Sequence, residues 1–329
     1  MKSGILKPLL IGLASVLVIV VLLMITPRVW SALHPDQPPV GYHFLTPTYL
    51  AIGVGLEHMI NRRPAVTEDI QEIKNIEYKN VNGKSLQLDI YKRKNLSSTA
   101  PLLVFIHGGG WRSGERADYL VYLIAFAKKG YVTATVSYRL LKDAPYPACA
   151  EDITDAVQWL FKNGEIYGYD PDRIALIGGS AGAHLAMLAA YHWRKPGTKS
   201  DSTSMQVHRI KAVVDIYGPT DLTTEFSRTN PTVTSFLAHS YVEAPELFLE
   251  ASPIHYLSRS CPPTMILHGT SDQTVPISQS DLLQSRLNTL GIPYAYYRVP
   301  LWPHTMDVIK RVNEFSEAKM TLFFNKYLK

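Results

Sequence analysis

A single serine lies between glycines where an apolar run gives way to a helical pattern, in IALIGGSAGAHLAML, Ile174–Leu188. Glycine tolerates positive φ and lets other backbone approach closely, so the run Gly178–Gly182 indicates a sharp, crowded turn between a strand and a helix. The run matches G-x-S-x-G, a pattern in which the turn projects the serine hydroxyl above a sheet as a nucleophile. A glycine-rich turn that only closes a strand–helix unit would look similar, so Ser180 needs support from elsewhere in the chain.

Three consecutive glycines follow an earlier apolar strand, in FIHGGGW, Phe105–Trp111. Glycines at such a place let backbone N–H groups converge on one oxygen without obstruction by side chains. The residue after the serine, Ala181, would supply another N–H from the first turn of its helix. The two glycine motifs together predict an oxyanion hole beside Ser180, and a flexible glycine loop is the alternative.

A serine hydroxyl is a weak nucleophile until a base accepts its proton, and the base needs an acceptor that fixes its tautomer. LHGTSDQTVP offers Asp272 after one expected strand, and VPLWPHT offers His304 after the next. Ser180, Asp272 and His304 therefore occur in the order Ser, Asp, His, each at the carboxyl end of a strand. Asp221 in YGPTDL is an alternative acid, but it precedes a long insertion, and we favour Asp272.

Four other polar residues near these motifs are expected to be structural. We expect His107 to hold the glycine loop through hydrogen bonds and Asp152 to cap a helix or anchor a loop. His268 is expected to end a strand, and His184 to pack within the helix that follows the serine. None of the four is assigned a role in proton transfer.

Short apolar strands that alternate with helical stretches must position these motifs. The expected strands are residues 102–107, 131–138, 174–179, 211–218, 264–269 and 294–300. Apolar strands separated by helices indicate an α/β fold with a mostly parallel sheet covered on both faces, in which ligands bind at the carboxyl ends of the strands. Before them, IEYKN and LQLDIYK alternate with period two around Asn82-Gly83, which predicts a β-hairpin.

The composition is that of a globular chain with one main domain. Of the 329 residues, 46% are hydrophobic and 19% charged, and the net charge of +5 is spread without a basic run, so no nucleic-acid partner is expected. Cys149 and Cys261 have neither metal-ligand nor Cys-x-x-Cys spacing. We favour two free thiols over a disulfide and expect no metal site.

An unbroken apolar stretch, LLIGLASVLVIVVLLMI, covers Leu9–Ile25 and is flanked by Lys2, Lys7 and Arg28. With its neighbours it reaches the roughly 20 residues that cross a bilayer as a helix. We expect residues 1–27 to be a single transmembrane anchor, with the folded domain on the extracytoplasmic side. Secretion after cleavage of a signal peptide is the alternative, although RVWSAL is a poor cleavage site.

The rest of the chain divides into a tether and a larger domain. Residues 28–70 are expected to be a proline-rich, extended tether, within which residues 48–60 form an amphipathic helix. That helix either packs on the domain, which we favour, or forms a cap or membrane-lying segment near the site. Residues 71–329 are the expected catalytic domain, and its insertion at residues 220–256 is expected to form a cap, with surface helices of no gating role as the alternative.

The chain resembles the α/β-hydrolase superfamily, in the esterase and lipase branch of hormone-sensitive-lipase-related and feruloyl-esterase-like carboxylesterases. The resemblance covers residues 70–329 and rests on HGGGW, SYRL, PYPACAEDITDAVQWL, DPDRIALIGGSAGAHLA, HGTSDQTVP and PHT. It implies an α/β-hydrolase fold, with Gly109 and Gly110 as oxyanion donors and Gly108 shaping the turn. Trp111 is similar to the feruloyl-esterase-like branch, whereas lipase relatives more often have Phe or Tyr there.

Residues and resemblance together predict a serine hydrolase that cleaves small-molecule carboxylic esters of short to medium acyl chain through an acyl-enzyme, with no metal or cofactor. An amidase, arylformamidase or peptidase with the same three residues is one alternative, because this chemistry does not choose between leaving groups. A catalytically silent, membrane-tethered binding module is another. The natural substrate and the oligomeric state stay open.

Overall fold

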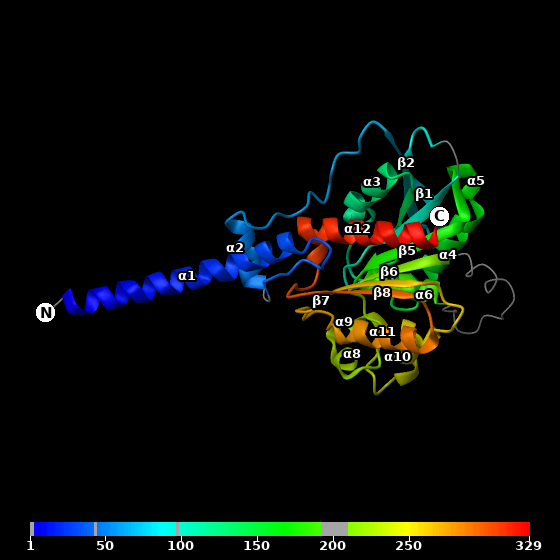
Figure 1. The fold of residues 1–329 in the computed structure, drawn as a ribbon. Coiled ribbons are helices and arrows are strands. Elements are labelled where there is room, and N and C mark those ends of the chain that lie inside the picture. The colour runs from blue at the N-terminus through cyan, green and yellow to red at the C-terminus, as the bar shows by residue number, and fades with distance from the viewer. Residues whose placement is uncertain (1–2, 43–44, 97–98, 192–209) are drawn as a thin grey trace.

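Eight strands form one sheet in the order β1-β2-β4-β3-β5-β6-β7-β8 (Figure 1). The computed structural model describes residues 3–42, 45–96, 99–191 and 210–329; outside these ranges lie residues 1–2 of the expected anchor, 43–44 of the expected tether, and 97–98 and 192–209 of the expected catalytic domain. The strands are β1 Ile70–Val81, β2 Lys84–Arg93, β3 Ala100–Ile106, β4 Val132–Val136, β5 Tyr169–Gly179, β6 Ile210–Ile216, β7 Thr264–Gly269 and β8 Tyr294–Val299. Only β1 with β2 and β2 with β4 pair antiparallel. The predicted mostly parallel sheet is therefore confirmed.

The hairpin between β1 and β2 turns at Asn82 and Gly83, which both have positive φ, at 51° and 84°. Two central residues with positive φ define the hairpin turn whose twist matches that of the flanking strands. Asparagine and glycine are the residues that adopt this conformation most readily. The local sequence thus sets the register of the outermost pair of strands.

Both faces of the sheet are buried, and the side chains of β3 alternate between two hydrophobic clusters. Leu102, Val104 and Ile106 belong to the first cluster, and Leu103 and Phe105 to the second. The period of two follows from the pleat of the strand, and a run that is apolar at every position buries both faces. This is why helices must cover the sheet on both sides.

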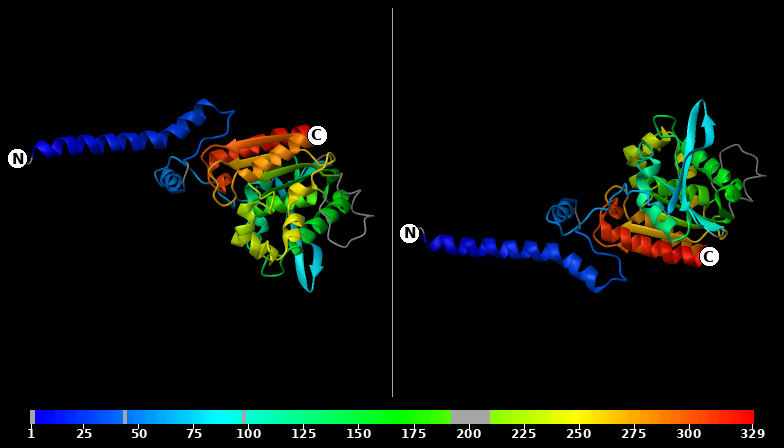
Figure 2. Two further views of the ribbon diagram at one scale, coloured as in Figure 1. Left: turned by 90° about the horizontal axis from the view of Figure 1, so that it is seen from below. Right: turned by 90° about the horizontal axis from the view of Figure 1, so that it is seen from above.

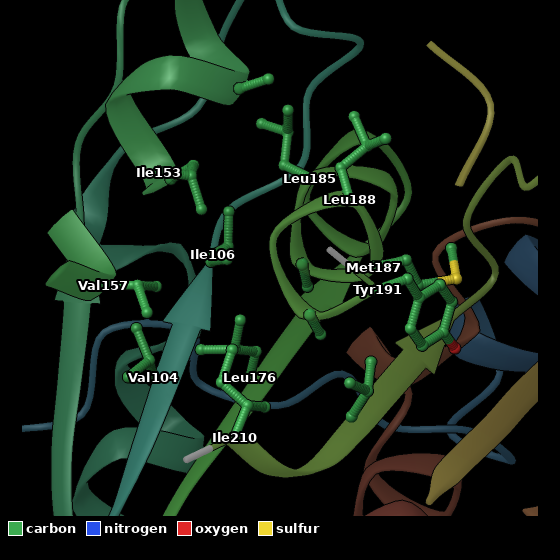
Figure 3. Packing of buried hydrophobic residues seen from close by; sticks show 14 of the residues in the cluster. Val104, Ile106, Ile153, Val157, Leu176, Leu185, Met187, Leu188, Tyr191 and Ile210 are labelled. Atoms are coloured by element: carbon green, nitrogen blue, oxygen red, sulfur yellow. The ribbon is translucent and has the colours of Figure 1, made fainter. Parts of the chain in front are cut away.

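Helices on each face complete the two clusters. The first face carries α4 Ala148–Lys162, α6 Ala181–Ala190 and α11 Ser278–Leu290, and the second carries α3 Leu120–Lys128 and α12 Lys310–Tyr327. Figure 3 shows Ile153 and Val157 of α4, and Leu185 of α6, packed over Val104 and Leu176 of the sheet. Each such side chain stabilises the fold by about 1.5–3 kcal/mol when fully buried, so α6 is fixed firmly behind the end of β5.

Three short helices lie between β6 and β7, within the expected insertion at residues 220–256. They are α8 Glu225–Thr229, α9 Pro231–Leu237 and α10 Pro245–Glu250, and they lie together with α11 in Figure 1. Thr224 caps α8 by accepting a hydrogen bond from the Ser227 N–H, and Asn230 caps α9 in the same way through the Thr232 N–H. Side-chain caps at both starts fix where these short helices begin.

The N-terminal helix α1 spans Ser3–Leu33 and projects from the domain as a long rod (Figures 1 and 2). Within its stretch Leu10–Leu33, an 18-residue window has a mean hydropathy of 2.8, so this stretch is long and apolar enough to cross a membrane, a test that a signal sequence would also meet. The helix continues through Pro27, beyond the boundary expected there. One proline removes a single backbone donor, and the hydroxyl of Thr26 donates to the carbonyl of Leu22 at 2.6 Å within this turn.

A buried ion pair fastens the N-terminal segment to α12. The guanidinium of Arg311 contacts the carboxylate of Glu57 at 2.7 Å and donates to the hydroxyl of Ser31 at 2.8 Å. Tyr42 donates to Glu57 at 2.9 Å, and Arg28 of α1 lies 3.9 Å from it. The segment expected to be an extended tether is thus helical at its start and packed on the domain, because α12 supplies a partner for its polar groups.

Candidate active site

Ser180 occupies a strained turn between β5 and α6. Its φ of 55° and ψ of −124° lie outside the regions that residues with a side chain usually adopt, and its N–H donates to the carbonyl of Ile216 at 2.9 Å. A Cβ atom at Gly178 would lie 2.3 Å from the backbone of Gly182, and one at Gly182 would lie 2.1 Å from the carbonyl oxygen of Ile106. Glycine is therefore required on both sides of the serine, as the motif predicts.

The structure brings Ser180, Asp272 and His304 together in one chain of hydrogen bonds. The Nε2 atom of His304 lies 3.0 Å from the Oγ atom of Ser180, and its Nδ1 atom lies 2.5 Å from Oδ2 of Asp272. Because a carboxylate only accepts hydrogen bonds, Nδ1 carries the proton and Nε2 is left to accept one. The imidazole is thereby oriented to take the proton of the serine hydroxyl.

Asp272 is buried and held by four donors. Its Oδ1 atom accepts hydrogen bonds from the backbone N–H groups of Thr274 at 2.8 Å and Val275 at 2.9 Å, while Oδ2 faces His304 and His268. Burial by itself raises the pKa of Asp272, but hydrogen bonds from His268 and His304 outweigh burial and hold the pKa well below its usual range. The carboxyl group therefore stays ionised.

His268 has a part in this site that the sequence did not indicate. It is fully buried, and its Nε2 atom lies 3.2 Å from Oδ2 of Asp272 and 2.9 Å from the carbonyl oxygen of Val275. Its Nδ1 atom lies 2.7 Å from the hydroxyl of Ser280. Two acceptors at Nε2 mean that this nitrogen carries the proton, and the Ser280 hydroxyl donates to Nδ1. The sequence signal that could have identified His268 is its spacing, since it is the penultimate residue of β7 and lies four residues before Asp272.

Asp221, the alternative acid, has partners other than His304. Its Oδ1 atom accepts hydrogen bonds from the N–H of Thr223 at 2.8 Å and from its hydroxyl at 2.6 Å, and it lies 3.8 Å from His255. These contacts make it the first residue of an Asx turn that leads into the inserted helices. The structure places Asp272, and not Asp221, against His304.

The remaining polar residues have structural contacts. Asp152 forms an ion pair with Arg139 at 2.7 Å and anchors the loop after β4 rather than capping α4. His107 stacks on Tyr138, with ring centroids 4.3 Å apart. His184 is buried within α6 and lies 2.7 Å from the carbonyl of Ala251, and burial lowers its pKa to about 4.

The two cysteines lie away from the site. Cys149 and Cys261 are both free and buried, so the favoured thiols and not the disulfide are found. Among the residues that the structure describes, His, Cys, Asp and Glu side chains form no group of three that could hold a metal ion.

Backbone amides of the glycine loop and of α6 line the cavity beside Ser180. Gly109 and Gly110 have φ of 104° and 59°, and the carbonyl of Gly109 accepts hydrogen bonds from the N–H groups of Arg112 and Ser113 at 3.1 Å. Within the described ranges, the N–H groups of Gly109 and Gly110 have no acceptor in the protein. Ala181 begins α6, where an N–H has no partner in its own helix. Three free donors thus lie along one wall.

The cavity has a volume of about 950 Å³ and is formed by loops at the carboxyl ends of the strands together with two added segments. The first segment is the region around α2 Leu45–Gly53, and the second is the inserted helices. Their side chains at the cavity wall are Thr48, Tyr49, Ile52, Met59, Phe226, Thr232 and Val233. The helix expected over residues 48–60 is found over Leu45–Gly53 and ends before the turn at Val54 and Gly55; it packs on the domain and at the same time covers part of the site.

Aromatic side chains form the wall on two sides of the serine. Trp111 stacks on Phe236 of α9 with ring centroids 4.0 Å apart, which closes the cavity next to the glycine loop. On the other side the ring of Tyr217 lies 4.6 Å from that of His304, and its hydroxyl donates to the buried Asp307. Burial raises the pKa of Asp307. The position of the imidazole is thus limited by packing as well as by hydrogen bonds.

Most of the segments that carry this site belong to a known protein family. The model of the BD-FAE family matches residues 88–287, which include the glycine loop, the serine turn and Asp272. The chain belongs to the BD-FAE family. As a BD-FAE protein it has the α/β-hydrolase fold of the esterase and lipase branch, and the predicted resemblance is confirmed.

Relatives of this BD-FAE protein are named as esterases. It is 33% identical over 243 residues to Esterase LipQ of Mycobacterium tuberculosis, covering 70% of this chain and 56% of LipQ. It is 31% identical over 236 residues to the probable carboxylic ester hydrolase LipM of that organism, covering 69% of this chain and 54% of LipM. The chain thus spans about half the length of these curated relatives.

A solved structure shares the fold of this BD-FAE protein. The truncated form of a carbohydrate esterase from gut microbiota matches with a TM-score of 0.68 and 23% identity, covering 80% of this chain and 99% of that one. At this identity the likeness concerns the fold.

Proposed function

We propose that this chain is a serine hydrolase that cleaves carboxylic esters, with Ser180 as nucleophile, His304 as base and Asp272 as the group that orients the base. The observation that carries the proposal is the chain of hydrogen bonds from Asp272 through His304 to Ser180 at the wall of a cavity of about 950 Å³. The esterase names of the relatives support ester hydrolysis.

The reaction proceeds in two steps. Ser180 Oγ attacks the ester carbonyl while its proton moves to Nε2 of His304, and the Asp272 carboxylate stabilises the imidazolium that forms. The tetrahedral oxyanion accepts hydrogen bonds from the N–H groups of Gly109, Gly110 and Ala181. His304 then gives its proton to the departing alkoxide, which leaves as the alcohol. Water, activated by His304, attacks the acyl-enzyme and releases the acid, which restores Ser180.

The acyl group that fits best is short to medium in length. Trp111, held by its stack on Phe236, closes the cavity next to the glycine loop, so an acyl chain bound there meets an aromatic wall. The opposite side of the cavity extends along α2 and leaves room for a larger alcohol. A series of p-nitrophenyl esters of rising acyl length tests this, and undiminished kcat/KM for the longest chains would contradict it.

The proposal includes a single-pass membrane anchor in α1, with the catalytic domain on the extracytoplasmic side. The span Leu10–Leu33 is about 36 Å long at 1.5 Å per residue, enough for a hydrocarbon core of about 30 Å. Arg28 and Ser31, at the end of α1, contact Glu57 and Arg311 of the domain, which supports retention of the helix over its removal as a signal peptide. Mass determination of the purified full chain tests retention, and protease protection in vesicles tests the side of the membrane.

The test of the enzymatic proposal uses the full chain in detergent with p-nitrophenyl butyrate, the matching amide and the matching formamide as substrates. We expect Ser180→Ala to lower turnover of the ester by about three orders of magnitude or more, because among the described residues Ser180 supplies the hydroxyl within hydrogen-bond distance of the His304 imidazole. Ser240→Ala, at an exposed serine of the insertion, is the control and should leave turnover unchanged. Turnover by Ser180→Ala at the rate of the wild type would reject the mechanism. Cleavage of the amide or formamide alone would assign an amidase, and no cleavage by the folded wild type would assign a binding module.

A further inference from the structure

One side of α2 faces the cavity and another faces away from the protein. Thr48 and Ile52 line the cavity, and the first of these is buried. The outer face of α2 consists of Leu50 and of Val54, which directly follows the last residue of the helix; both lie outside the cavity lining and are 50% and 61% exposed. Large apolar side chains that are exposed side by side mark a surface that contacts something apolar. One helix, α2, therefore separates the cavity from the surroundings of its exposed outer face.

The outer face of α2 lies at the level where α1 would leave a membrane. Arg28 of α1 donates to the carbonyl oxygen of Leu56, just after α2, and Met24 shares a hydrophobic cluster with Ala51. From Leu10 to Arg28 the helix rises about 27 Å, close to the hydrocarbon thickness of a bilayer of about 30 Å. A charged residue after such a run marks the interface with the headgroups, and the chain just after α2 is held to α1 there by the hydrogen bond of Arg28.

The views from below and above agree on this arrangement. In both, α2 lies beside the second half of α1, on the side of the domain from which the rod projects (Figure 2). The ion pair of Arg311 with Glu57 and the contacts of Arg28 and Ser31 hold α1 in this direction relative to the domain. Because the anchor is docked and not free to swivel, α2 cannot turn away from the membrane surface.

We propose that the outer face of α2, at Leu50 and Val54, lies in the interfacial layer of the membrane that α1 crosses, and that the cavity takes esters of lipophilic alcohols directly from that bilayer. The inference rests on the proposed function and names its substrate class. The acyl group is transferred to Ser180, the long-chain alcohol leaves with the proton from His304 and stays in the bilayer, and water releases the acid.

Two esters with the same acyl group test the inference. One is p-nitrophenyl butyrate in solution, and the other is hexadecyl butyrate held in phosphatidylcholine vesicles that also carry the full-length protein. Both form the same butyryl-enzyme, so the second half of the reaction is common to them, and only the location of the alcohol differs. Release of butyrate is measured by chromatography for each.

The variant is Leu50→Ser with Val54→Ser, and the matched control is Ile166→Ser with Val242→Ser, which replaces two apolar residues that are 72% and 92% exposed elsewhere on the surface. We expect the α2 variant to lose about tenfold in the rate on hexadecyl butyrate, since two apolar side chains no longer enter the interface. Its rate on p-nitrophenyl butyrate should be unchanged, and the control should match the wild type on both esters.

A second readout does not depend on activity. An environment-sensitive fluorophore attached at Leu50→Cys should show a blue-shifted emission in vesicles, whereas one at Val242→Cys should not, and the two native cysteines are buried. A water-like emission at Leu50→Cys, or equal rates of wild type and α2 variant on hexadecyl butyrate, would overturn the inference.

The two proposals fail in different ways. Wild-type protein that cleaves p-nitrophenyl butyrate but not hexadecyl butyrate would overturn the membrane inference and leave the proposed function standing. Wild-type protein that cleaves neither would reject the proposed function, and the inference with it.

Discussion

His268 provides the sharpest test of how the site is positioned, because it contacts Asp272 but lies behind it. Replacing it with leucine removes one of the four hydrogen bonds to the Asp272 carboxylate and leaves the carbonyl of Val275 and the hydroxyl of Ser280 without a partner. A hydrogen bond to a charged group contributes about 1.5–3 kcal/mol. We expect His268→Leu to lower the free energy of unfolding by about 2–3 kcal/mol.

Part of this lost interaction energy should also appear as a lower kcat. Asp272 keeps the hydrogen bonds from Thr274, Val275 and His304, so its charge remains but its orientation is less strictly fixed. If about half of the lost interaction acts on the transition state, kcat falls about tenfold, since 1.4 kcal/mol corresponds to a factor of ten. KM should change little, because His268 is buried outside the cavity wall.

The pH dependence of the stability loss follows from the depressed pKa of Asp272. A carboxyl group whose pKa is lower in the folded state stabilises the fold above its unfolded value of about 4, and the contribution is lost as the pH falls further. The destabilisation by His268→Leu should therefore be largest near neutral pH and shrink below about pH 4. Denaturant unfolding of the detergent-solubilised protein at several pH values measures it.

Comparison of two variants can refute this reasoning. His268→Gln retains an amide N–H that can face Asp272, so it should recover most of the kcat lost in His268→Leu. Equal loss of kcat in both variants, or a His268→Leu protein that is destabilised but has the kcat of the wild type, would mean that His268 only fills space.

Three further predictions concern the serine turn, the cavity wall and a buried acid. Gly182→Ala should prevent stable folding, because its Cβ would lie 2.1 Å from the carbonyl of Ile106, whereas Gly53→Ala, with nothing within 4 Å, should express and melt like the wild type. Trp111→Ala should shift the kcat/KM optimum in an acyl-length series toward longer chains, and an unchanged optimum would remove Trp111 from the acyl site. Burial raises the pKa of Asp215 to about 7, so stability should fall as the pH rises from about 4 to about 7. Asp215→Asn should flatten that part of the stability profile, and an unchanged slope in denaturant unfolding would show that another group causes it.

The three candidate active-site residues could be predicted because the sequence patterns that indicate them are local. Each of Ser180, Asp272 and His304 follows an apolar strand, and in a parallel sheet the carboxyl ends of neighbouring strands meet at one edge. The strand order therefore brings together residues that are remote along the chain. The glycines at positions 178 and 182 could likewise be predicted, because the sharp turn at Ser180 leaves no room for a side chain on either side of it.

The surroundings of the site could not be predicted because they depend on contacts between distant segments. Glu57 meets Arg311, and the indole of Trp302 donates to the carbonyl of Pro39 at 2.9 Å, although neither pair is marked by any motif. The same holds for α2, whose amphipathic pattern indicates a helix that packs but not the surface that it covers. The continuation of α1 through Pro27 was not predicted because proline usually breaks a helix in soluble proteins. Here the hydroxyl of Thr26 donates to the carbonyl of Leu22 in the same turn, a contact that the sequence pattern does not indicate.

The inserted helices α8, α9 and α10 begin and end on the sheet between β6 and β7, while the nucleophile, base and acid follow β5, β8 and β7. The residues of these helices that line the cavity, Phe226, Thr232 and Val233, can therefore change without altering the spacing of the reacting groups. Under the proposed function, new substrate preferences can evolve or be engineered at these three positions, provided that Phe236 stays stacked on Trp111 beside the glycine loop.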